Sequence, residues 1–322
     1  MKAIQFDRLG GPEVMELREV PKPALKPGTV IVKNHTIAIN FGDLFFTEGT
    51  YLVKPVFPDT PGMEASGVID AVADDVTDLK PGARVAYIGM GSYAEYTRIR
   101  GNRVIPIPDH LSFEEAAAFP IAVLTAWHMI NTCHRTEPGQ TMIVHSAAGG
   151  VGLAAVQLAK AAGARVFGTV SSDVKRDLVR QYGADEVINY ETQDFAAEAM
   201  RLTANRGVDL ILDAVGKPTF DKGLSCLAMF GHLISYGRAG GVPDKLDVTR
   251  LFPKALKVSG WAVPMVYAHH EVHRRGLEDV FRLSREGKLK IPIGGKYPLA
   301  EAVAAHRHLL SRNSVGKLLL IP

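Results

Sequence analysis

The stretch Val144-His145-Ser146-Ala147-Ala148-Gly149-Gly150-Val151-Gly152-Leu153 decides the fold, because it ends an apolar run in a glycine turn and then begins an alanine-rich helix. Gly149 lets the backbone approach phosphate groups closely, and Gly152 lets the helix pack tightly on the strand. The first N–H groups of the helix present its positive dipole end to an anion. The alternative interpretation of this stretch is a turn of small residues between a buried strand and a helix, which binds no ligand. A dinucleotide pyrophosphate is predicted at four residues: Ala148, Gly149, Gly150 and Val151.

Beyond this turn, apolar runs alternate with amphipathic stretches at a regular spacing, as a parallel sheet with crossover helices requires. The sequence predicts six strands, at residues 141–147, 164–170, 186–190, 208–215, 232–236 and 257–263. It predicts four helices, at residues 152–162, 173–182, 195–205 and 220–229, each ending at a glycine that suits a left-handed helix end. We therefore expect an α/β fold with a doubly wound Rossmann sheet, whose ligand lies beyond the C-terminal ends of the strands.

The first third of the chain has short apolar runs separated by Pro-Gly turns, which is typical of a compact β-barrel. Ser112 stands three residues before Glu115, a capping box that predicts a helix leading into the second domain. We place the boundary near Phe119. This gives a catalytic domain over residues 1–119, completed by residues 262–322, and a nucleotide-binding domain over residues 120–261.

The composition excludes several classes of protein. A net charge of +3 with 22% charged residues, and no Lys/Arg block, argues against a nucleic-acid or membrane surface and favours a small-molecule partner. Pro120 and the glycine turn interrupt the two longest uncharged segments, so no membrane span is expected. Two distant cysteines exclude a disulfide framework, and no export signal is visible, so we expect a reducing, cytoplasmic location.

Seven separated motifs occur in order along the chain: Gly10-Gly11-Pro12-Glu13-Val14, Ile39-Asn40-Phe41-Gly42-Asp43, Pro61-Gly62-Met63-Glu64-Ala65-Ser66-Gly67-Val68, Leu124-Thr125-Ala126-Trp127, Ala147-Ala148-Gly149-Gly150-Val151-Gly152, Gly183-Ala184-Asp185 with Val187-Ile188-Asn189-Tyr190, and Gly316-Lys317. Over its full length the chain thus resembles the medium-chain dehydrogenase/reductase superfamily, and within it the zinc-free, zeta-crystallin-like NADPH quinone oxidoreductase branch. The resemblance implies a GroES-like β-barrel beside the Rossmann sheet.

The residues at the zinc positions of this superfamily do not suit a metal. Its zinc enzymes use a cysteine, a histidine-glutamate pair and a later cysteine or aspartate as ligands. Here Asn40 stands at the cysteine position, and Met63 replaces the histidine before Glu64. His269, His270 and His273 lack accompanying cysteine or acidic ligands, and we interpret them as a solvated helix start. Without a Lewis acid, we expect hydride transfer to an acceptor that is already electrophilic.

The end of the second Rossmann strand indicates which nicotinamide cofactor is used. An NAD enzyme usually has an acidic residue there, whereas this chain has Ser171-Ser172 followed by Lys175. That cationic setting suits the 2′-phosphate of NADPH, and the resemblance implies that Tyr190 adds a hydroxyl. Asp173 could repel a phosphate, but it can equally cap the next helix, and Lys175 could simply be solvated.

The resemblance also implies the residues that form the reacting pocket. It places Asn40 and Asp43 beside the nicotinamide ribose and the substrate, and Tyr51 at the position of a proton-donating tyrosine in related enoyl-thioester reductases. Asp43 could instead cap a turn, and Tyr51 could only pack on the nicotinamide. The resemblance further implies that Thr125 binds the cofactor at the domain junction, and that four further residues close the cofactor groove: Val215, Tyr236, Gly237 and Arg312. For Arg312 the alternative is a surface charge.

These observations predict hydride transfer from NADPH to a quinone, with reduction of an enone or enoyl thioester as the second hypothesis. A thioester of coenzyme A would need basic residues near the substrate, and the candidates are Lys54, Arg250, Lys254 and Arg274. A hypothesis of another class is a structural protein that binds NADPH without turnover. We also expect a homodimer, because the strand at 257–263 would otherwise leave an exposed sheet edge.

Overall fold

The computed structural model describes residues 1–263 and 269–322, which form two compact units. One unit comprises 1–121 and 291–322, and the other comprises 122–290. The first division lies close to the expected Phe119, whereas the chain returns at Ile291 rather than near Ala262. The reason is helix α8 (His270–Arg285), which packs on α3 (Leu124–His128) within the second unit. The Trp127 indole N–H donates to the Asp279 carboxylate at 2.7 Å.

The first unit contains a seven-stranded sheet built around β3 (Thr29–Ala38), whose neighbours on its two sides come from distant parts of the chain. β3 pairs antiparallel with β4 (Glu64–Val72), β6 (Tyr96–Arg100) and β15 (Lys317–Ile321). The outer strands are β5 (Arg84–Ile88), β7 (Val104–Pro106) and β14 (Ile293–Pro298). A separate hairpin joins β1 (Lys2–Gln5) to β2 (Glu16–Glu19). The predicted β-rich first domain is thereby confirmed.

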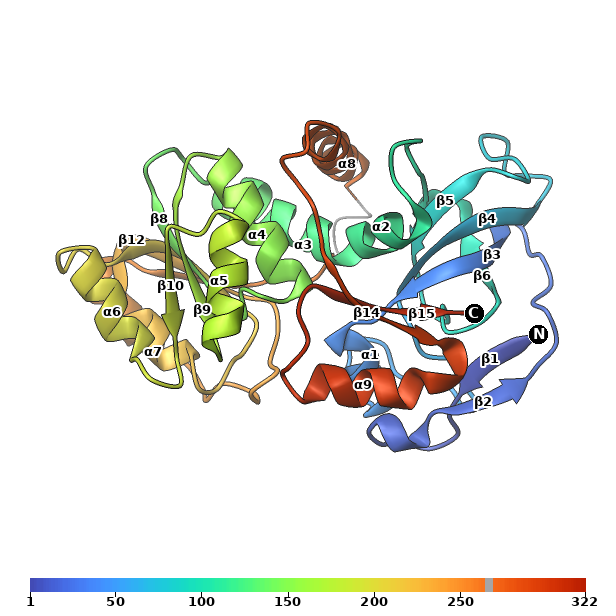
Figure 1. Cartoon of the computed structure of the whole chain (residues 1–322), viewed down its shortest axis with the longest axis horizontal. Helices are drawn as coiled ribbons and strands as arrows, with labels where there is room; N and C mark the ends of the chain where they lie inside the picture. The colour runs from blue at the N-terminus through green and yellow to red at the C-terminus, as the bar shows by residue number, and fades with distance from the viewer. Residues whose placement is uncertain (264–268) are drawn as a thin grey trace. The chain divides into compact units, whose positions relative to one another are not determined.

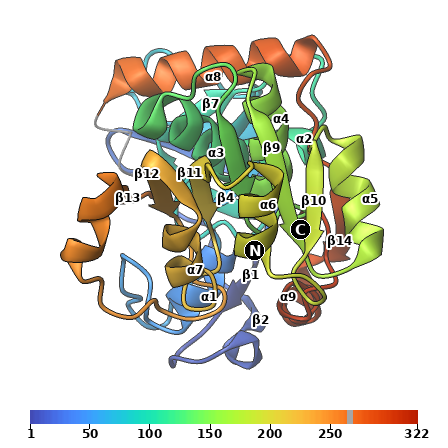
Figure 2. The ribbon, with the colours of Figure 1, turned by 90° about the vertical axis from the view of Figure 1, so that its left-hand side faces the viewer.

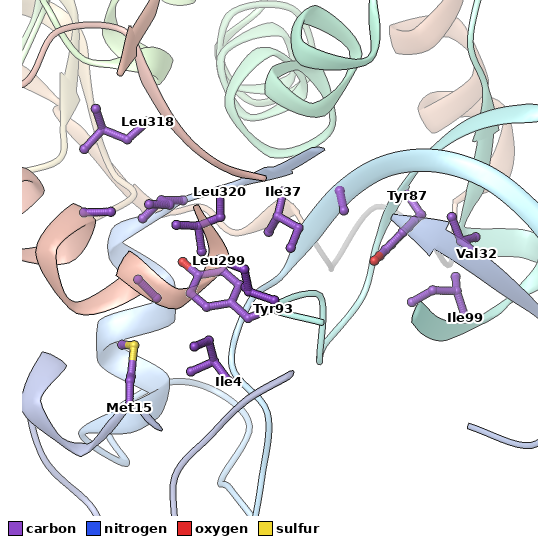
Figure 3. Close-up of a cluster of buried hydrophobic side chains, with 14 of the residues drawn as sticks. Ile4, Met15, Val32, Ile37, Tyr87, Tyr93, Ile99, Leu299, Leu318 and Leu320 are labelled. Carbon is purple, nitrogen blue, oxygen red and sulfur yellow. The ribbon is translucent and has the colours of Figure 1, made fainter. Parts of the chain in front are cut away.

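Three helices of the first unit matter for its polar residues. α1 (Phe41–Thr47) follows β3, α2 (Phe113–Ala118) packs on β3 and β4, and α9 (Ala302–Leu310) lies along β14 and β15 (Figure 1). The predicted capping box begins α2: the Ser112 side chain accepts from the Glu115 N–H, and the Glu115 carboxylate accepts from the Ser112 N–H at 2.9 Å. The apolar core between these elements includes two buried tyrosines, Tyr87 and Tyr93 (Figure 3).

The second unit contains the predicted parallel six-stranded sheet, in the order β10-β9-β8-β11-β12-β13. Its strands are β8 (Thr141–Val144), β9 (Arg165–Val170), β10 (Glu186–Asn189), β11 (Val208–Asp213), β12 (Leu227–Ser235) and β13 (Lys257–Gly260). Its crossover helices are α4 (Gly150–Ala161), α5 (Asp173–Gln181), α6 (Phe195–Leu202) and α7 (Phe220–Ser225). Figure 2 shows α5 beside β10 and α7 beside β12, and all four residues of β8 are buried, as a covered parallel strand requires.

Two local predictions are wrong. Helix α7 ends at Ser225 rather than Met229, because the buried Leu227 and Ala228 already belong to β12, where Leu227 pairs with Val208. The expected left-handed Gly231 does not end this helix either: Cys226, which follows the helix, has φ −99°, and the left-handed residue next to Gly231 is Phe230, at φ 63° within β12.

Pro120 does not interrupt the helix as expected. The helical run Phe113–His134 continues through it by π-helical turns at Phe119–Val123 and Met129–His134. A proline offers no N–H, and the next N–H, that of Ile121, donates to the Glu64 carboxylate at 2.7 Å. By length and composition this run could cross a membrane, but 78% of its most apolar window is buried within the protein, as in a core helix.

Candidate functional site

A buried polar network occupies the positions at which zinc-dependent relatives were expected to hold a metal. The Lys317 ammonium donates to Glu64 Oε1 at 2.8 Å, to the Asn40 amide oxygen at 2.7 Å and to the Ile39 carbonyl at 2.8 Å. Asn40 Nδ2 donates to the same Glu64 oxygen at 2.9 Å. Glu64 is fully buried and Lys317 is 4% exposed, so solvent does not screen this ion pair.

This network leaves little room for a metal ion. An ammonium already neutralises the Glu64 carboxylate, both heteroatoms of the Asn40 amide are bonded, and Met63 is a buried thioether. Zn²⁺ instead needs several closely placed thiolate, imidazole or carboxylate ligands. Within residues 1–263 and 269–322, no three His, Cys, Asp or Glu side chains are grouped so as to hold a metal. The donor set of this chain therefore does not fit the catalytic zinc of the superfamily.

Asp43 lies in the first turn of α1, three residues after Asn40. It caps this turn, which is one of the two roles that the sequence left open for it. Asn40 is the residue before α1, and its backbone N–H donates to Asp43 Oδ2 at 2.8 Å. The same oxygen accepts from the Tyr93 hydroxyl at 2.9 Å. Burial raises the pKa of Asp43 to about 7, against the opposing hydrogen bonds from Asn40 and Tyr93 and the charge of Lys317. A carboxyl with this pKa can hold or release a proton near neutral pH.

Tyr51 is half-buried against α1 and Met63. A Cβ on Gly42 would lie 3.0 Å from the Met63 sulfur and 3.4 Å from Tyr51 Cε2, so the absence of a side chain at Gly42 makes room for both. Burial, and after it the charge of Asp43, raises the pKa of the Tyr51 phenol. The Tyr51 hydroxyl makes no hydrogen bond within residues 1–263 and 269–322. The phenol is thus protonated at neutral pH and suited to donate a hydrogen bond to a ligand.

The glycine turn of the second unit has the form that the sequence predicts. Gly149 precedes α4 and has no side chain to cap it, so the N–H groups of the first turn lack a helical partner and can bind an anion. A Cβ on Gly152 would lie 2.4 Å from the Ser146 carbonyl oxygen and 2.7 Å from Ala147 Cα, which explains the glycine there. A Cβ on Gly149 would meet only the Ser146 oxygen, at 3.4 Å. Gly149, Gly150 and Val151 are partly exposed, whereas Ala148 is buried.

The expected 2′-phosphate residues follow two neighbouring strands. The Tyr190 N–H donates to the Val170 carbonyl at 3.0 Å, so Tyr190 and Ser171 follow the paired ends of β10 and β9. Ser172 caps α5, and half-buried Lys175 lies in the first turn, where burial lowers its pKa. Asp173 is the first residue of the helix rather than its cap, and its carboxylate binds Arg176 at 3.0 Å. Ser171, Lys175 and Tyr190 thus follow the neighbouring ends of β9 and β10 or lie in the first turn of α5.

The remaining predicted residues are distributed over both units. In the second unit, Val215 follows β11, Tyr236 and Gly237 follow β12, and Thr125 is buried in α3. The Tyr236 N–H donates to the Asp213 carbonyl at 2.9 Å, which brings the ends of β11 and β12 together. Arg312 belongs to the first unit, where it is exposed and left-handed at φ 60° after α9.

Sequence reasoning missed four residues that support these sites. Lys317, Tyr93 and His306 complete the polar network of the first unit, and only Lys317 stood in a recognised motif. Asp213 ends β11, and its Oδ1 accepts from the N–H groups of Val215 and Gly216 at 2.8 and 3.1 Å, which fixes the predicted Val215 turn. An aspartate directly after the apolar run Leu210-Ile211-Leu212 was the available signal.

The comparisons with known proteins agree with this architecture. The alcohol dehydrogenase GroES-like domain matches residues 26–109, and the zinc-binding dehydrogenase family matches residues 150–278. A quinone oxidoreductase of Pseudomonas aeruginosa is 36% identical over all of this chain and 99% of its own length. A 2-haloacrylate reductase of a Burkholderia species is 32% identical over 99% of this chain and 98% of its own.

A solved structure extends the similarity to three dimensions. The crystal structure of Escherichia coli quinone oxidoreductase complexed with NADPH has a TM-score of 0.96 and 32% identity, with all of both chains covered. The resemblance inferred from the seven motifs is therefore confirmed. The chain belongs to the quinone oxidoreductase family of the medium-chain dehydrogenase/reductase superfamily.

Proposed function

We propose that this chain reduces a quinone with NADPH and without a metal ion. The observation that carries the proposal is the buried Lys317–Glu64–Asn40 network, which occupies the positions of the metal ligands. A quinone is already electrophilic and needs no Lewis acid, whereas oxidation of an alcohol would. The similarity to an oxidoreductase solved with NADPH supports the cofactor.

The residues fit NADPH in two places. The N-terminus of α4 would hold the pyrophosphate, and Ser171, Lys175 and Tyr190 would hold the 2′-phosphate. When bound, NADPH supplies a hydride from its reduced nicotinamide. The chain itself supplies position, hydrogen bonds from Tyr51 and a carboxyl at Asp43 that holds a proton near neutral pH.

A direct assay tests this function. Purified protein, treated with a chelator, is mixed with NADPH and 1,4-benzoquinone, and the loss of reduced nicotinamide is followed by absorbance. We expect turnover that survives chelation and is faster than the uncatalysed reaction. Turnover abolished by chelation and restored by Zn²⁺ would contradict the metal-free proposal. Binding of NADPH without any turnover would favour the structural, non-catalytic alternative.

Reduction of an activated alkene is the second candidate, and two observations favour it. One relative is named a 2-haloacrylate reductase, and the protonated Tyr51 phenol, which has no hydrogen-bond partner among the described residues, suits protonation of a carbon beside a carbonyl. Tyr51→Phe should lower the rate with an enone by about 100-fold and leave the benzoquinone rate nearly unchanged. Equal losses with both acceptors would indicate that Tyr51 acts only by packing.

A coenzyme A thioester is less well supported as substrate, because each of the basic candidates is engaged within the chain. Arg250 binds Asp221 at 2.6 Å, Arg274 binds Glu271 at 2.8 Å and Lys254 donates to the Leu227 carbonyl at 2.6 Å. Lys54 donates to the Gly49 carbonyl. A comparison of crotonyl thioester with benzoquinone as acceptors tests this ranking.

We also propose a cytoplasmic homodimer. Its support is β13, which forms the end of the six-stranded sheet with one side unpaired in the part of the chain that the structure describes. The support for the location is that Cys133 and Cys226 are free thiols. Sedimentation at micromolar concentration should give twice the chain mass, and a monomer would contradict the dimer. Cell fractionation tests the location.

A further inference from the structure

The strand order of the second unit indicates where the two halves of a bound dinucleotide lie. The sheet runs β10-β9-β8-β11-β12-β13, so the residues expected at the 2′-phosphate follow β9 and β10, and the pyrophosphate turn follows β8. A dinucleotide that extends along the C-terminal edge in this direction brings its nicotinamide half to β11 and β12. Val215 and Tyr236, which are predicted for the cofactor groove, follow these two strands and are partly exposed.

A buried carboxylate holds the turn that follows β11. Asp213 ends this strand and has no measurable solvent exposure. Its Oδ1 accepts hydrogen bonds from the Val215 N–H at 2.8 Å, the Gly216 N–H at 3.1 Å and the Thr219 hydroxyl at 2.8 Å. Hydrogen bonds that a carboxyl group accepts stabilise its ionised form. A negative charge is therefore buried at the strand ends where the nicotinamide half is expected.

This charge has no cationic hydrogen-bond partner among the residues that the structure describes. The three groups that donate to Oδ1 are neutral, and Oδ2 is buried and accepts no hydrogen bond. Burial lowers the pKa of His145 against the charge of Asp213, so that ring is neutral. Burial, and after it the charge of Asp213, raises the pKa of Tyr236, so that phenol is neutral as well. These neighbours leave the charge of Asp213 uncompensated.

The turn that carries the carboxylate is fixed by the loop that follows β12. The Ala239 N–H donates to the Ala214 carbonyl at 3.1 Å, and the Gly240 N–H donates to the Val215 carbonyl at 2.7 Å. A Cβ on Gly237 would lie 2.7 Å from the Ala214 carbonyl oxygen, so the two backbones approach closely only because this residue is glycine. The turn therefore cannot reorient its carbonyl groups without breaking hydrogen bonds within the unit.

Holding the turn does not by itself require a charge. An asparagine side chain also offers an oxygen that accepts hydrogen bonds, and it is neutral. A buried carboxylate without a paired cation is costly, because the charge loses its hydration. We therefore look for an effect of the charge on the group that is expected beside the turn.

We propose that the buried charge of Asp213 makes the second unit favour NADP⁺ over NADPH and so assists hydride transfer. The proposal rests on the proposed function, in which a quinone takes a hydride from NADPH and a proton from solvent to give a hydroquinone and NADP⁺. The nicotinamide ring is neutral in NADPH and positively charged in NADP⁺. A negative charge that solvent screens poorly stabilises this positive charge as it develops. Asp213 acts through its electric field and not by contact with the ring.

The test compares the affinities of the two cofactor forms in the absence of any acceptor. Asp213→Asn removes the charge and keeps an oxygen that can accept from the turn. Calorimetric titration gives the Kd for NADP⁺ and the Kd for NADPH. We expect the ratio of the first to the second to rise by about 10-fold relative to the wild type. A variant that only loosened the turn would weaken the binding of both forms alike and leave this ratio unchanged.

Two controls separate the charge from damage to the fold. Asp209→Asn is the matched variant, because Asp209 lies near the other end of β11, where its Oδ2 accepts from the Thr141 N–H at 2.8 Å. It should leave the ratio within about 2-fold of the wild type. Adenosine 2′,5′-bisphosphate lacks the nicotinamide and should bind the wild type and Asp213→Asn with the same Kd. If Asp213→Asn does not fold, Asp213→Ser offers a neutral hydroxyl to the turn and should raise the ratio likewise.

The rate of the chemical step gives a second measurement. In a single turnover with benzoquinone, Asp213→Asn should oxidise bound NADPH about 3- to 10-fold more slowly than the wild type. The Ki of NADP⁺ as a product inhibitor should rise at the same time, because the variant binds the oxidised form less tightly. Asp209→Asn should change neither quantity.

The outcomes distinguish this proposal from the proposed function. A wild type that binds NADPH but does not reduce a quinone would contradict the function, while the ratio of the two Kd values would still report the effect of the charge. An active wild type whose ratio is the same as that of Asp213→Asn would overturn the role of Asp213 alone. A shift of equal size in Asp209→Asn would also overturn it.

Discussion

The Lys317 ammonium lies 2.8 Å from the Glu64 carboxylate, in a part of the first unit where both side chains are almost completely buried. Breaking such a pair leaves a buried charge without compensation. The pair also orients Asn40, since its amide oxygen accepts from Lys317 and its amide nitrogen donates to Glu64.

Lys317→Met should therefore lower the free energy of unfolding by about 3 to 5 kcal/mol, as measured by urea denaturation. Lys296→Met is the matched control: Lys296 binds Glu114 at 2.9 Å but is half exposed, so about 1 kcal/mol or less is expected. Adding Glu64→Gln to Lys317→Met should recover part of the loss. If the two lysine variants lost equal amounts of unfolding free energy, burial would not make the Lys317–Glu64 pair more important for stability than the exposed Lys296–Glu114 pair.

The raised pKa of Asp43 predicts a pH dependence of stability. Its pKa is about 7 in the folded chain and about 4 in the unfolded chain, so the folded state binds more protons between these values and stability falls as pH rises. Relative to Asp43→Asn, the wild type should lose about 2 to 3 kcal/mol between about pH 5 and about pH 8. Buried histidines affect both proteins alike and cancel in the difference. If the difference in unfolding free energy between the two proteins did not change over this pH range, Asp43 would stay ionised throughout it.

The two glycines of the phosphate turn should respond differently to alanine. Gly149→Ala has room in the folded chain, with the nearest atom at 3.4 Å, so the free energy of unfolding should change by less than about 0.5 kcal/mol. A side chain at Gly149 is expected to hinder the close approach of the backbone to the pyrophosphate, so the Kd for NADPH should rise by about 10-fold or more. Fluorescence titration measures this.

Gly152→Ala places its methyl 2.4 Å from the Ser146 oxygen and should destabilise the chain by about 1 to 3 kcal/mol in addition to weakening binding. If both variants lost stability equally, the tight approach of α4 to the turn would not be the reason for Gly152.

Lys175→Ala should raise the KM for NADPH by about 10- to 100-fold and leave the KM for NADH nearly unchanged, because only NADPH carries a 2′-phosphate. Lys222→Ala removes an exposed lysine of α7 that binds Asp194 at 2.6 Å and serves as the control. A parallel loss with both cofactors would show that Lys175 acts on the fold of α5 rather than on the phosphate.

Local sequence signals determined much of the second unit. The glycine turn, the alternation of apolar runs with helices, and the glycines after α4, α5 and α6 act over a few residues, so their consequences can be predicted from the sequence. The boundary between α7 and β12 was not predictable in this way. Leu227 joins the sheet because β11 offers it a partner, which overrides the helical pattern of its neighbours.

The sequence by itself determined the Rossmann turn, the capping box at Ser112 and the absence of the usual zinc ligands at Asn40 and Met63, because each is a matter of residue type at a short spacing. Only the tertiary structure decided what replaced those ligands. Lys317 reaches Asn40 and Glu64 across more than 250 positions of sequence, and His306 reaches Asp43 through Tyr93. The protonation of Asp43 depends on burial and on these distant charges, which no local pattern encodes.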